Sequence, residues 1–359
     1  RRPFNGQAAN LLDILKFFVR FTRLPHHYSR KMGAKVGRTQ HRPVEEALDA
    51  CVNSTGYRFP LADSKAWLQH LHERGYVVVA QALLQPEVSK AKEMLAEDLS
   101  EHVGKSFVLD EPASWRDAKI GKTGLVSGSV VQRAGSWYVR SRAGVKDAFS
   151  KIWKTPELIV SMDAILVWRP WWLDASWKPE TEGLHLDQNP FSKPNLECVQ
   201  GMVPLLPVTE STGGLQVVPF SHTPEAKEAL KQEYPRFKYK GDWCRLFRDD
   251  PSSILLLCEA GDLILWDSRT VHGGLVGTGN NPIVPDSTTE LARLAVTVAM
   301  TPRAWAGKLV QMARVKGFER GQNFNHCPHE AGTSDGTLKG RVSKNYKPIQ
   351  LTPEQRALL

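Results

Sequence analysis

The stretch "GDLILWDSRTVHGG", residues 261–274, joins a short apolar run to a polar turn and then to a histidine followed by two glycines. Similar apolar runs recur up to about residue 300 and are separated by Gly, Pro, Asn and Asp; they are "AILVWRP", "VQGMVPLLPV", "LQVVPF", "SILLLC" and "RLAVTVAM". Short β-prone runs between turns are typical of sandwiches and jelly-roll barrels. The sequence therefore predicts a mainly β core.

Helical signals precede this β-rich part. The segment "SKAWLQHLHERG" predicts a helix over 64–75 that ends at Gly75. The segment "YVVVAQAL", 76–83, predicts a strand, and "PEVSKAKEMLAEDLSEH", 86–102, predicts a helix with proline in its first turn. We expect these helices to flank the β core.

A second stretch, "TEGLHLDQNP", residues 181–190, places His185 and Asp187 two positions apart. On a strand such side chains point to the same face, so an imidazole and a carboxylate there can bind one metal ion. The alternative is a surface strand with two polar outward residues. Considered alone, that alternative is favoured, because His-x-Asp is short and common.

Two further residues later in the chain favour the metal site over the surface strand. His272 follows the predicted strand 263–266, and Arg293 opens the apolar run 291–300. Two histidines and one aspartate on one face of an octahedral metal are typical of non-haem Fe(II) oxygenases. A 2-oxoglutarate molecule and O₂ would fill the open positions, and the far carboxylate of 2-oxoglutarate suits a guanidinium. A buried structural histidine and an arginine in an ion pair remain the alternatives for His272 and Arg293 individually.

Taken together, these motifs resemble those of the phytanoyl-CoA dioxygenase-like family of Fe(II)/2-oxoglutarate oxygenases, and the resemblance spans roughly residues 65–302. The motifs that carry the resemblance are "LHERGYVVVAQALLQPEV", the His-x-Asp pair, "GMVPLLPVTESTGGLQVVPFSH", "GDLILWDSRTVHGG" and "RLAVTVAMTPR". The resemblance implies a double-stranded β-helix (a jelly-roll, cupin-like core) with helices outside it. It also implies that His185, Asp187 and His272 are the iron ligands and that Arg293 binds 2-oxoglutarate.

Two departures from the family pattern are visible. The spacing from His272 to Arg293 is longer than usual, and "VGTGNNPIVPDSTTE", 276–290, is expected to be an inserted loop. The family usually has Pro-Gly-Ser-His where this chain has "PFSH", 219–222. We expect that change to affect only the local turn.

Candidate substrate-binding residues come from two segments. Gln132, Trp137 and Arg140 lie in "SGSVVQRAGSWYVR", 127–140, where this family often lines its pocket, and Gln188 and Asn189 directly follow the His-x-Asp pair. Structural roles are equally compatible with each of them. The four tryptophans of "WRPWWLDASW", 168–177, could wall a pocket, but core packing is favoured for them.

The expected function is therefore Fe(II)/2-oxoglutarate-dependent hydroxylation of a small molecule, with 2-oxoglutarate converted to succinate and CO₂. Desaturation, epoxidation or ring chemistry remain open, and halogenation is disfavoured because Asp187 fills the position that a halide needs. A non-catalytic metal- or ligand-binding jelly roll is a further alternative. The sequence does not identify the substrate or the oligomeric state.

The net charge of +9 is concentrated at the two ends of the chain. Residues 1–60 contain 11 Lys/Arg and 4 Asp/Glu, and residues 303–349 contain 9 and 3, so the middle is mildly acidic. A nucleic-acid enzyme would more often be basic around its site as well, so no specific nucleic acid is expected. We expect a basic N-terminal helical extension and linker (1–63), the dioxygenase domain (64–302) and a basic, weakly periodic C-terminal covering segment (303–359).

The five cysteines are few, widely spaced and without a Cys-x-x-Cys pair. This pattern favours a reducing compartment, the cytoplasm or an organelle lumen, over secretion. No run of 18 apolar residues exists, so no transmembrane segment is expected. The helix expected at 10–24 is interpreted as a packing element rather than a membrane-surface helix or targeting remnant, and "NHCPHE", 325–330, lacks visible partners for a second metal site.

Overall fold

The computed structural model describes residues 56–246, 248–279, 290–330 and 346–359. The expected helix at 10–24, Cys51 and most of the expected loop at 276–290 lie outside the described residues.

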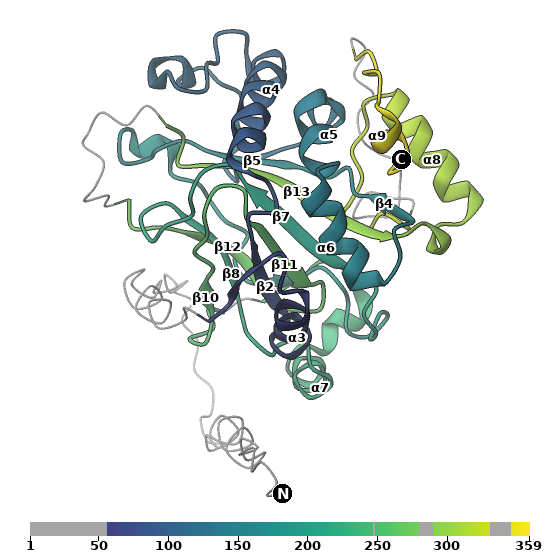
Figure 1. Ribbon diagram of the computed structural model, residues 1–359. Helices are drawn as coiled ribbons and strands as arrows, with labels where there is room; N and C mark the ends of the chain where they lie inside the picture. Colours follow the sequence, from purple (N-terminus) through teal and green to yellow (C-terminus); the bar gives the residue numbers. More distant parts are fainter. Residues whose placement is uncertain (1–55, 247, 280–289, 331–345) are drawn as a thin grey trace, which may run out of the picture. The chain divides into compact units, whose positions relative to one another are not determined.

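Two sheets form the centre of the described part of the chain (Figure 1). In spatial order the larger one contains β1 (Arg58–Pro60), β2 (Tyr76–Ala80), β11 (Leu263–Asp267), β7 (Val199–Pro204), β13 (Arg293–Pro302), β5 (Ile165–Trp168) and β3 (Leu125–Val126), with β4 (Leu158–Val160) paired to β13. The smaller one contains β10 (Ile254–Leu255), β8 (Gly213–Val217), β12 (His272–Val276), β6 (His185–Leu186) and β9 (Cys244–Arg245). This arrangement confirms the expected jelly-roll core.

Helices cover the outer face of the larger sheet (Figure 1); they are α3 (Ser64–Arg74), α4 (Gln85–Val103), α5 (Ala134–Arg140) and α6 (Ala143–Trp153). Further along the chain come α7 (Pro224–Glu233), α8 (Lys308–Glu319) and α9 (Pro353–Arg356). Helix α3 ends as predicted, because Gly75 adopts φ 85° and its N–H donates to the Leu71 carbonyl. Helix α4 has proline in its first turn, also as predicted.

The strands of the larger sheet are buried on both faces, which explains why they read as unbroken apolar runs. In β13, Leu294, Val296 and Val298 pack into the core under the helices. Arg293 and Thr297, on the opposite face, line a cavity between the sheets. The period of two along one strand thus separates core residues from candidate site residues.

The "PFSH" turn shows the expected local effect. Phe220, at the position where the family usually has glycine, adopts φ 64°, a backbone conformation that costs a side-chain-bearing residue roughly 1–2 kcal/mol. Its ring is exposed, and the Arg74 guanidinium carbon lies 4.5 Å from the ring centroid. The turn therefore accommodates the larger residue on the surface.

The C-terminal segment is more integrated than the sequence suggested. Instead of weakly periodic chain it contains the 12-residue helix α8, and Phe318, Phe324 and Leu358 join the core that lies under the helices. Arg314, on α8, is almost completely buried. The basic composition of this segment suggested an exposed surface, but Arg314, one of its basic residues, is part of the interior.

Among the described residues, no helix has both the length and the apolar character needed to cross a bilayer. The four described cysteines, Cys198, Cys244, Cys258 and Cys327, are buried and form no disulfide.

Candidate metal centre

A cavity of about 220 Å³ lies between the two sheets. The larger sheet supplies Gln200, Met202 and Arg293 to its wall, and the smaller sheet supplies His185 and His272. The sheets thus bring together residues that are far apart in the sequence.

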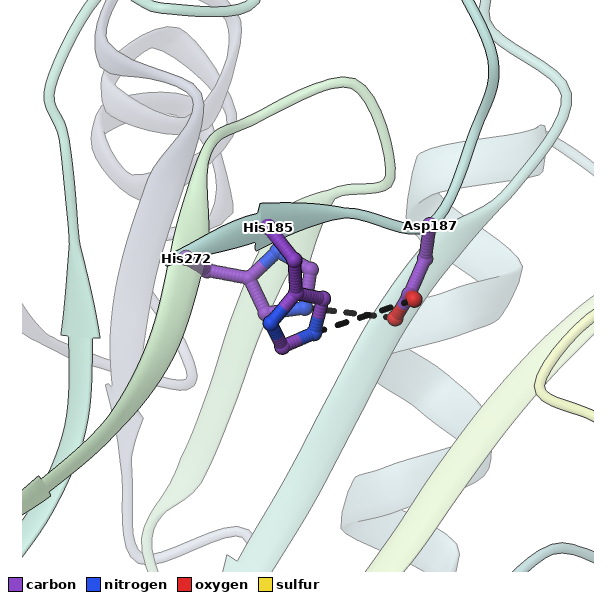
Figure 2. Close-up of side chains that lie close together, drawn as sticks. All are labelled: His185, Asp187 and His272. Carbon is purple, nitrogen blue, oxygen red and sulfur yellow. Dashed lines mark ion pairs between the residues drawn. The ribbon is translucent and has the colours of Figure 1, made fainter. Parts of the chain in front are cut away.

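Pairing of β6 with β12 sets the geometry of the centre. The register places His185 directly opposite His272, and Asp187 lies two residues beyond His185 (Figure 2). Asp187 Oδ1 lies 3.7 Å from His185 Nε2, and Asp187 Oδ2 lies 3.3 Å from His272 Nε2. All three ligand atoms lie within 4.8 Å of one another, so the three side chains can hold one metal ion.

Backbone carbonyls fix both imidazoles. His185 Nδ1 lies 2.9 Å from the Gly183 oxygen, and His272 Nδ1 lies 2.9 Å from the Thr270 oxygen. A carbonyl only accepts hydrogen bonds, so each Nδ1 carries the hydrogen and each Nε2 presents its lone pair toward Asp187. This is the tautomer that a metal ligand requires.

The charge state also suits a divalent cation. Burial lowers the pKa of His185, which eases loss of the second ring proton when a metal binds. Burial would raise the pKa of Asp187, but the neighbouring His185, His326 and His272 outweigh it and hold the pKa well below its usual value. Two imidazole nitrogens and an ionised carboxylate that face a cavity fit Fe(II), with positions left for further ligands.

Arg293 lies in the same cavity wall, and no oxygen atom of the described residues accepts a hydrogen bond from its guanidinium. Its guanidinium carbon lies 4.5 Å from the Trp168 ring centroid, and Nη2 lies 3.1 Å from Met202 Sδ. Its Nε has no hydrogen-bond partner within the described residues. Burial lowers its pKa to about 10, so it stays charged at neutral pH, and a buried cation without a counter-charge is costly. The site therefore suits an anionic ligand.

Two other arginines are less suited to that role. Arg269 is bound through two nitrogens to the Asp267 carboxylate, and Arg303 Nη2 donates to the Ala357 carbonyl. Neither lines the cavity.

Gln132, Trp137 and Arg140, the candidate substrate residues of the earlier segment, lie in the core and do not line the cavity. Gln132 Nε2 donates to the Gln322 carbonyl at 2.6 Å, and its amide oxygen accepts from Trp137 Nε1 at 3.1 Å. Arg140 Nη1 donates to the Val131 carbonyl at 2.7 Å. Their hydrogen bonds serve internal packing.

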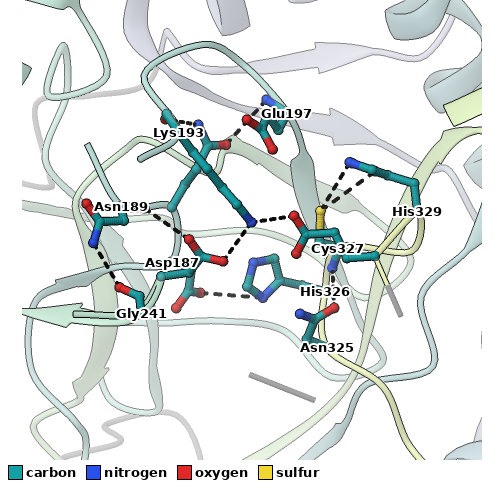
Figure 3. A network of polar contacts seen from close by, with 12 residues as sticks. Asp187, Asn189, Lys193, Glu197, Gly241, Asn325, His326, Cys327 and His329 are labelled. Atoms are coloured by element: carbon teal, nitrogen blue, oxygen red, sulfur yellow. Dashed lines mark hydrogen bonds and ion pairs between the residues drawn. The ribbon is translucent and has the colours of Figure 1, made fainter. Parts of the chain in front are cut away.

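Gln188 and Asn189 likewise stabilise a loop beside the centre. Gln188 Nε2 donates to the carbonyls of Lys193 and Asn195. Asn189 Nδ2 donates to the Phe237 carbonyl at 2.8 Å, and Figure 3 shows it also facing Gly241. Of the tryptophan-rich segment, Trp168 lines the cavity, while Trp171 and Trp172 pack beside it.

Gln200, His326 and Asp163 line the cavity, although the sequence did not predict them as site residues. Gln200 Nε2 donates to Asp187 Oδ2 at 3.1 Å. His326 comes from the C-terminal segment and places Nδ1 3.9 Å from the same oxygen (Figure 3). Asp163, between β4 and β5, also lines the wall. A polar residue before an apolar strand was the available signal for Asp163, whereas nothing local to His326 indicates the contact.

The "NHCPHE" segment brings Cys327, His329 and Glu330 within 4.8 Å of one another through their ligand atoms. Cys327 Sγ lies 3.7 Å from His329 Nδ1 (Figure 3). Glu330, however, is paired with the Lys193 ammonium group, whose positive charge disfavours a cation there.

Comparison with known proteins places this geometry in a family. The family model described as phytanoyl-CoA dioxygenase (PhyH) matches residues 71–279. The chain is 28% identical over 284 residues to "Ava biosynthesis cluster protein O" of Aspergillus versicolor, which covers 73% of this chain and 86% of the relative.

Solved structures with a similar fold include the non-haem α-ketoglutarate-dependent epimerase SnoN from nogalamycin biosynthesis, at 17% identity and a TM-score of 0.45, covering 67% of this chain and 82% of SnoN. The carbocyclase SnoK, from the same biosynthesis, has 16% identity and a TM-score of 0.44, covering 68% of this chain and 87% of SnoK. The matched family region spans more than half of the chain and includes His185, Asp187 and His272. This chain therefore belongs to the phytanoyl-CoA dioxygenase (PhyH) family of Fe(II)/2-oxoglutarate-dependent oxidoreductases.

Proposed function

We propose that this enzyme hydroxylates a small molecule, with iron held by His185, Asp187 and His272 and with 2-oxoglutarate bound by Arg293. The observation that carries the proposal is the cross-strand pairing of His185 with His272, which puts both Nε2 atoms within 4 Å of the Asp187 carboxylate. When bound, iron with 2-oxoglutarate and O₂ supplies the oxidant for the C–H bond and yields succinate and CO₂.

The side chains of this protein position those components. The Gly183 and Thr270 carbonyls orient the two imidazoles, and Gln200 orients the Asp187 carboxylate. Arg293 would pair with the far carboxylate of 2-oxoglutarate through two parallel hydrogen bonds. Trp168 packs over this guanidinium, which excludes water from one of its faces and strengthens the pair.

The outcome of the oxidation depends on the substrate. SnoN is an epimerase and SnoK is a carbocyclase, so ring chemistry is the alternative to hydroxylation. Halogenation is disfavoured because Asp187 occupies the ligand position that a halide would need. Product mass distinguishes the outcomes: hydroxylation adds one oxygen atom, ring closure removes two hydrogens, and epimerisation leaves the mass unchanged.

The assignment of the metal ligands is tested with Asp187→Ala. We expect this variant to remain folded but to lose Fe(II) binding and 2-oxoglutarate conversion to succinate. Asp147→Ala is the control, since Asp147 is an α6 residue paired with Lys151 at the surface. Wild-type succinate formation by Asp187→Ala would refute the ligand set.

A further inference from the structure

Two carboxylates in the cavity wall, Glu182 and Asp163, are not used by the proposed iron and 2-oxoglutarate sites. Asp163 lines the wall between β4 and β5 and makes no hydrogen bond or ion pair with any residue that the structure describes. Burial raises its pKa to about 6, so it is largely ionised at neutral pH. A partly buried carboxylate without a donor is costly for the fold alone.

The backbone around Asp163 is fixed. The Ala164 N–H donates to Thr297 Oγ1 at 2.9 Å, and the Thr297 N–H donates to the Ala164 carbonyl at 3.1 Å. These bonds hold Asp163 beside β13, four residues beyond Arg293. At about 3.3 Å per residue, the backbone positions of the two residues are separated along the strand by roughly 13 Å. Asp163 therefore lies well away from the proposed 2-oxoglutarate carboxylate.

Three neighbouring groups, His326, Asp187 and Arg140, act electrostatically on this carboxylate. Arg140 is completely buried, donates to the Val131 and Thr297 carbonyls and does not line the cavity, so it acts on Asp163 only through its charge. His326 lines the cavity and also acts electrostatically on Asp163. The cavity side of Asp163 thus remains available to a ligand.

The charges of the cavity indicate the charge that a third ligand, besides iron and 2-oxoglutarate, should carry. The two positive charges of Fe(II) and the one on Arg293 would balance the Asp187 carboxylate and the two carboxylates of 2-oxoglutarate. Asp163 and Glu182 then remain as lining carboxylates, and Arg140 offsets only one of them from behind. The rest of the cavity is therefore acidic, and its apolar lining includes Leu125 and Leu166.

We propose that Asp163, flanked by His326, binds a protonated nitrogen of the substrate, which would then be an amine with an apolar body. This inference rests on the proposed function for the identity of the other two ligands. The carboxylate would accept a charge-assisted hydrogen bond from the ammonium group, and the bound cation would relieve the unpaired buried charge.

The test uses three probes of similar size that differ in one polar group: phenethylamine, 2-phenylethanol and phenylacetate. Their affinities are measured by calorimetry on the full chain loaded with Co(II) and 2-oxoglutarate. For the wild type we expect phenethylamine to bind most tightly and phenylacetate most weakly. In Asp163→Asn the affinity for phenethylamine should fall about 10- to 100-fold, as for loss of one hydrogen bond to a charged group, while that for 2-phenylethanol changes little.

Asp98→Asn is the matched control. Asp98 is another buried carboxylate whose pKa burial raises to about 6, but it accepts a hydrogen bond from the Gly135 N–H and lies outside the cavity. It should keep the wild-type preference. An unchanged preference in Asp163→Asn, tighter binding of phenylacetate, or no binding of phenethylamine at millimolar concentration would overturn the proposal. Titration of Co(II) and 2-oxoglutarate alone tests the proposed function separately. If these two do not bind, the proposed function is wrong; if they bind and phenethylamine does not, only the amine proposal is wrong.

Discussion

Arg293 in the cavity and Arg314 in the C-terminal segment are both buried guanidinium groups, yet they are satisfied in opposite ways. Arg314 donates to the carbonyls of Val160 at 2.6 Å, Leu359 at 3.0 Å and Pro328 at 3.1 Å, and also to that of Leu358. Among the described residues, the Arg293 guanidinium makes one hydrogen bond, to the Met202 sulfur, and lies over the Trp168 ring. Burial lowers the pKa of both, to about 9 and about 10 respectively.

The difference supports a structural role for Arg314 and the proposed ligand-binding role for Arg293. Arg314 joins helix α8 to β4 and to Leu359 through backbone carbonyls. Within the described residues, Arg293 Nε has no hydrogen-bond partner, and Nη2 donates only to a sulfur atom. Substitution should therefore affect folding at one position and ligand binding at the other.

The largest effect is expected for Arg314→Leu. Several buried carbonyls lose their donor at once, and each costs about 1–3 kcal/mol, so the free energy of unfolding should fall by roughly 3–6 kcal/mol. Urea unfolding monitored by fluorescence measures the change. Lys316→Met, on the same helix, should stay within about 0.5 kcal/mol of wild type. If the free energy of unfolding of Arg314→Leu fell by less than about 1 kcal/mol, Arg314 would not have the structural role that distinguishes it from Arg293.

Arg293→Leu should show the reverse pattern. Loss of a buried charge pair with 2-oxoglutarate should weaken its binding by roughly 2–5 kcal/mol. The free energy of unfolding without ligand should not fall, because the guanidinium has no oxygen acceptor in that state. Calorimetric titration of 2-oxoglutarate and urea unfolding of the same preparation test both halves. Unchanged 2-oxoglutarate affinity would direct attention to another cation.

Gln200→Leu extends the comparison to a neutral side chain. Removal of the hydrogen bond to Asp187 Oδ2 should lower metal affinity about 10- to 100-fold, as is usual for residues that orient a metal ligand. Competition with a chelator gives the affinity independently of turnover. The control is Gln216→Leu, because Gln216 is equally buried on β8 but lies outside the cavity lining. Equal metal affinities in the two variants would mean that Gln200 does not position Asp187.

Lys227 is a third buried cation, and its Nζ has no hydrogen-bond partner within the described residues. Burial lowers its pKa to about 7; the charge of Arg269 lowers it slightly further, while Asp267 and Cys244 have smaller opposing effects. Between pH 7 and about 10.4 the unfolded chain therefore binds a proton that the folded chain does not. Its contribution makes stability rise with pH in this window, by up to about 1.4 kcal/mol per pH unit.

Lys227→Met should abolish this rise and stabilise the protein most at pH 7 and below. Melting temperatures measured from pH 6 to 9 follow the effect. Lys231→Met, which alters a lysine paired with Glu228 on the same helix, should keep the wild-type slope. A wild-type slope in Lys227→Met would show that this lysine is charged in the folded protein.

Local sequence patterns determined much of the fold. Gly75 ended its helix, the apolar runs formed the strands, and the His-x-Asp pair predicted a shared strand face, because each depends on near neighbours in the chain. The same patterns drew attention to His272, which follows the predicted strand 263–266, and to Arg293, which opens the apolar run 291–300. That Arg293 would lack an oxygen partner could not be read from them.

Tertiary packing decided what the patterns left open. Gln132, Trp137 and Arg140 resemble ligand-binding residues in sequence, but the core packs around them. Hydrogen bonds within the protein engage the Gln132 amide, the Trp137 indole N–H and two of the three Arg140 side-chain nitrogens. Asp163 and His326 are 163 residues apart and meet in the cavity only because the chain near Phe324 pairs with Met162, through a 2.6 Å hydrogen bond from the Phe324 N–H. Burial and partners at such distances are set by the whole fold, so no local pattern could distinguish the satisfied Arg314 from the available Arg293.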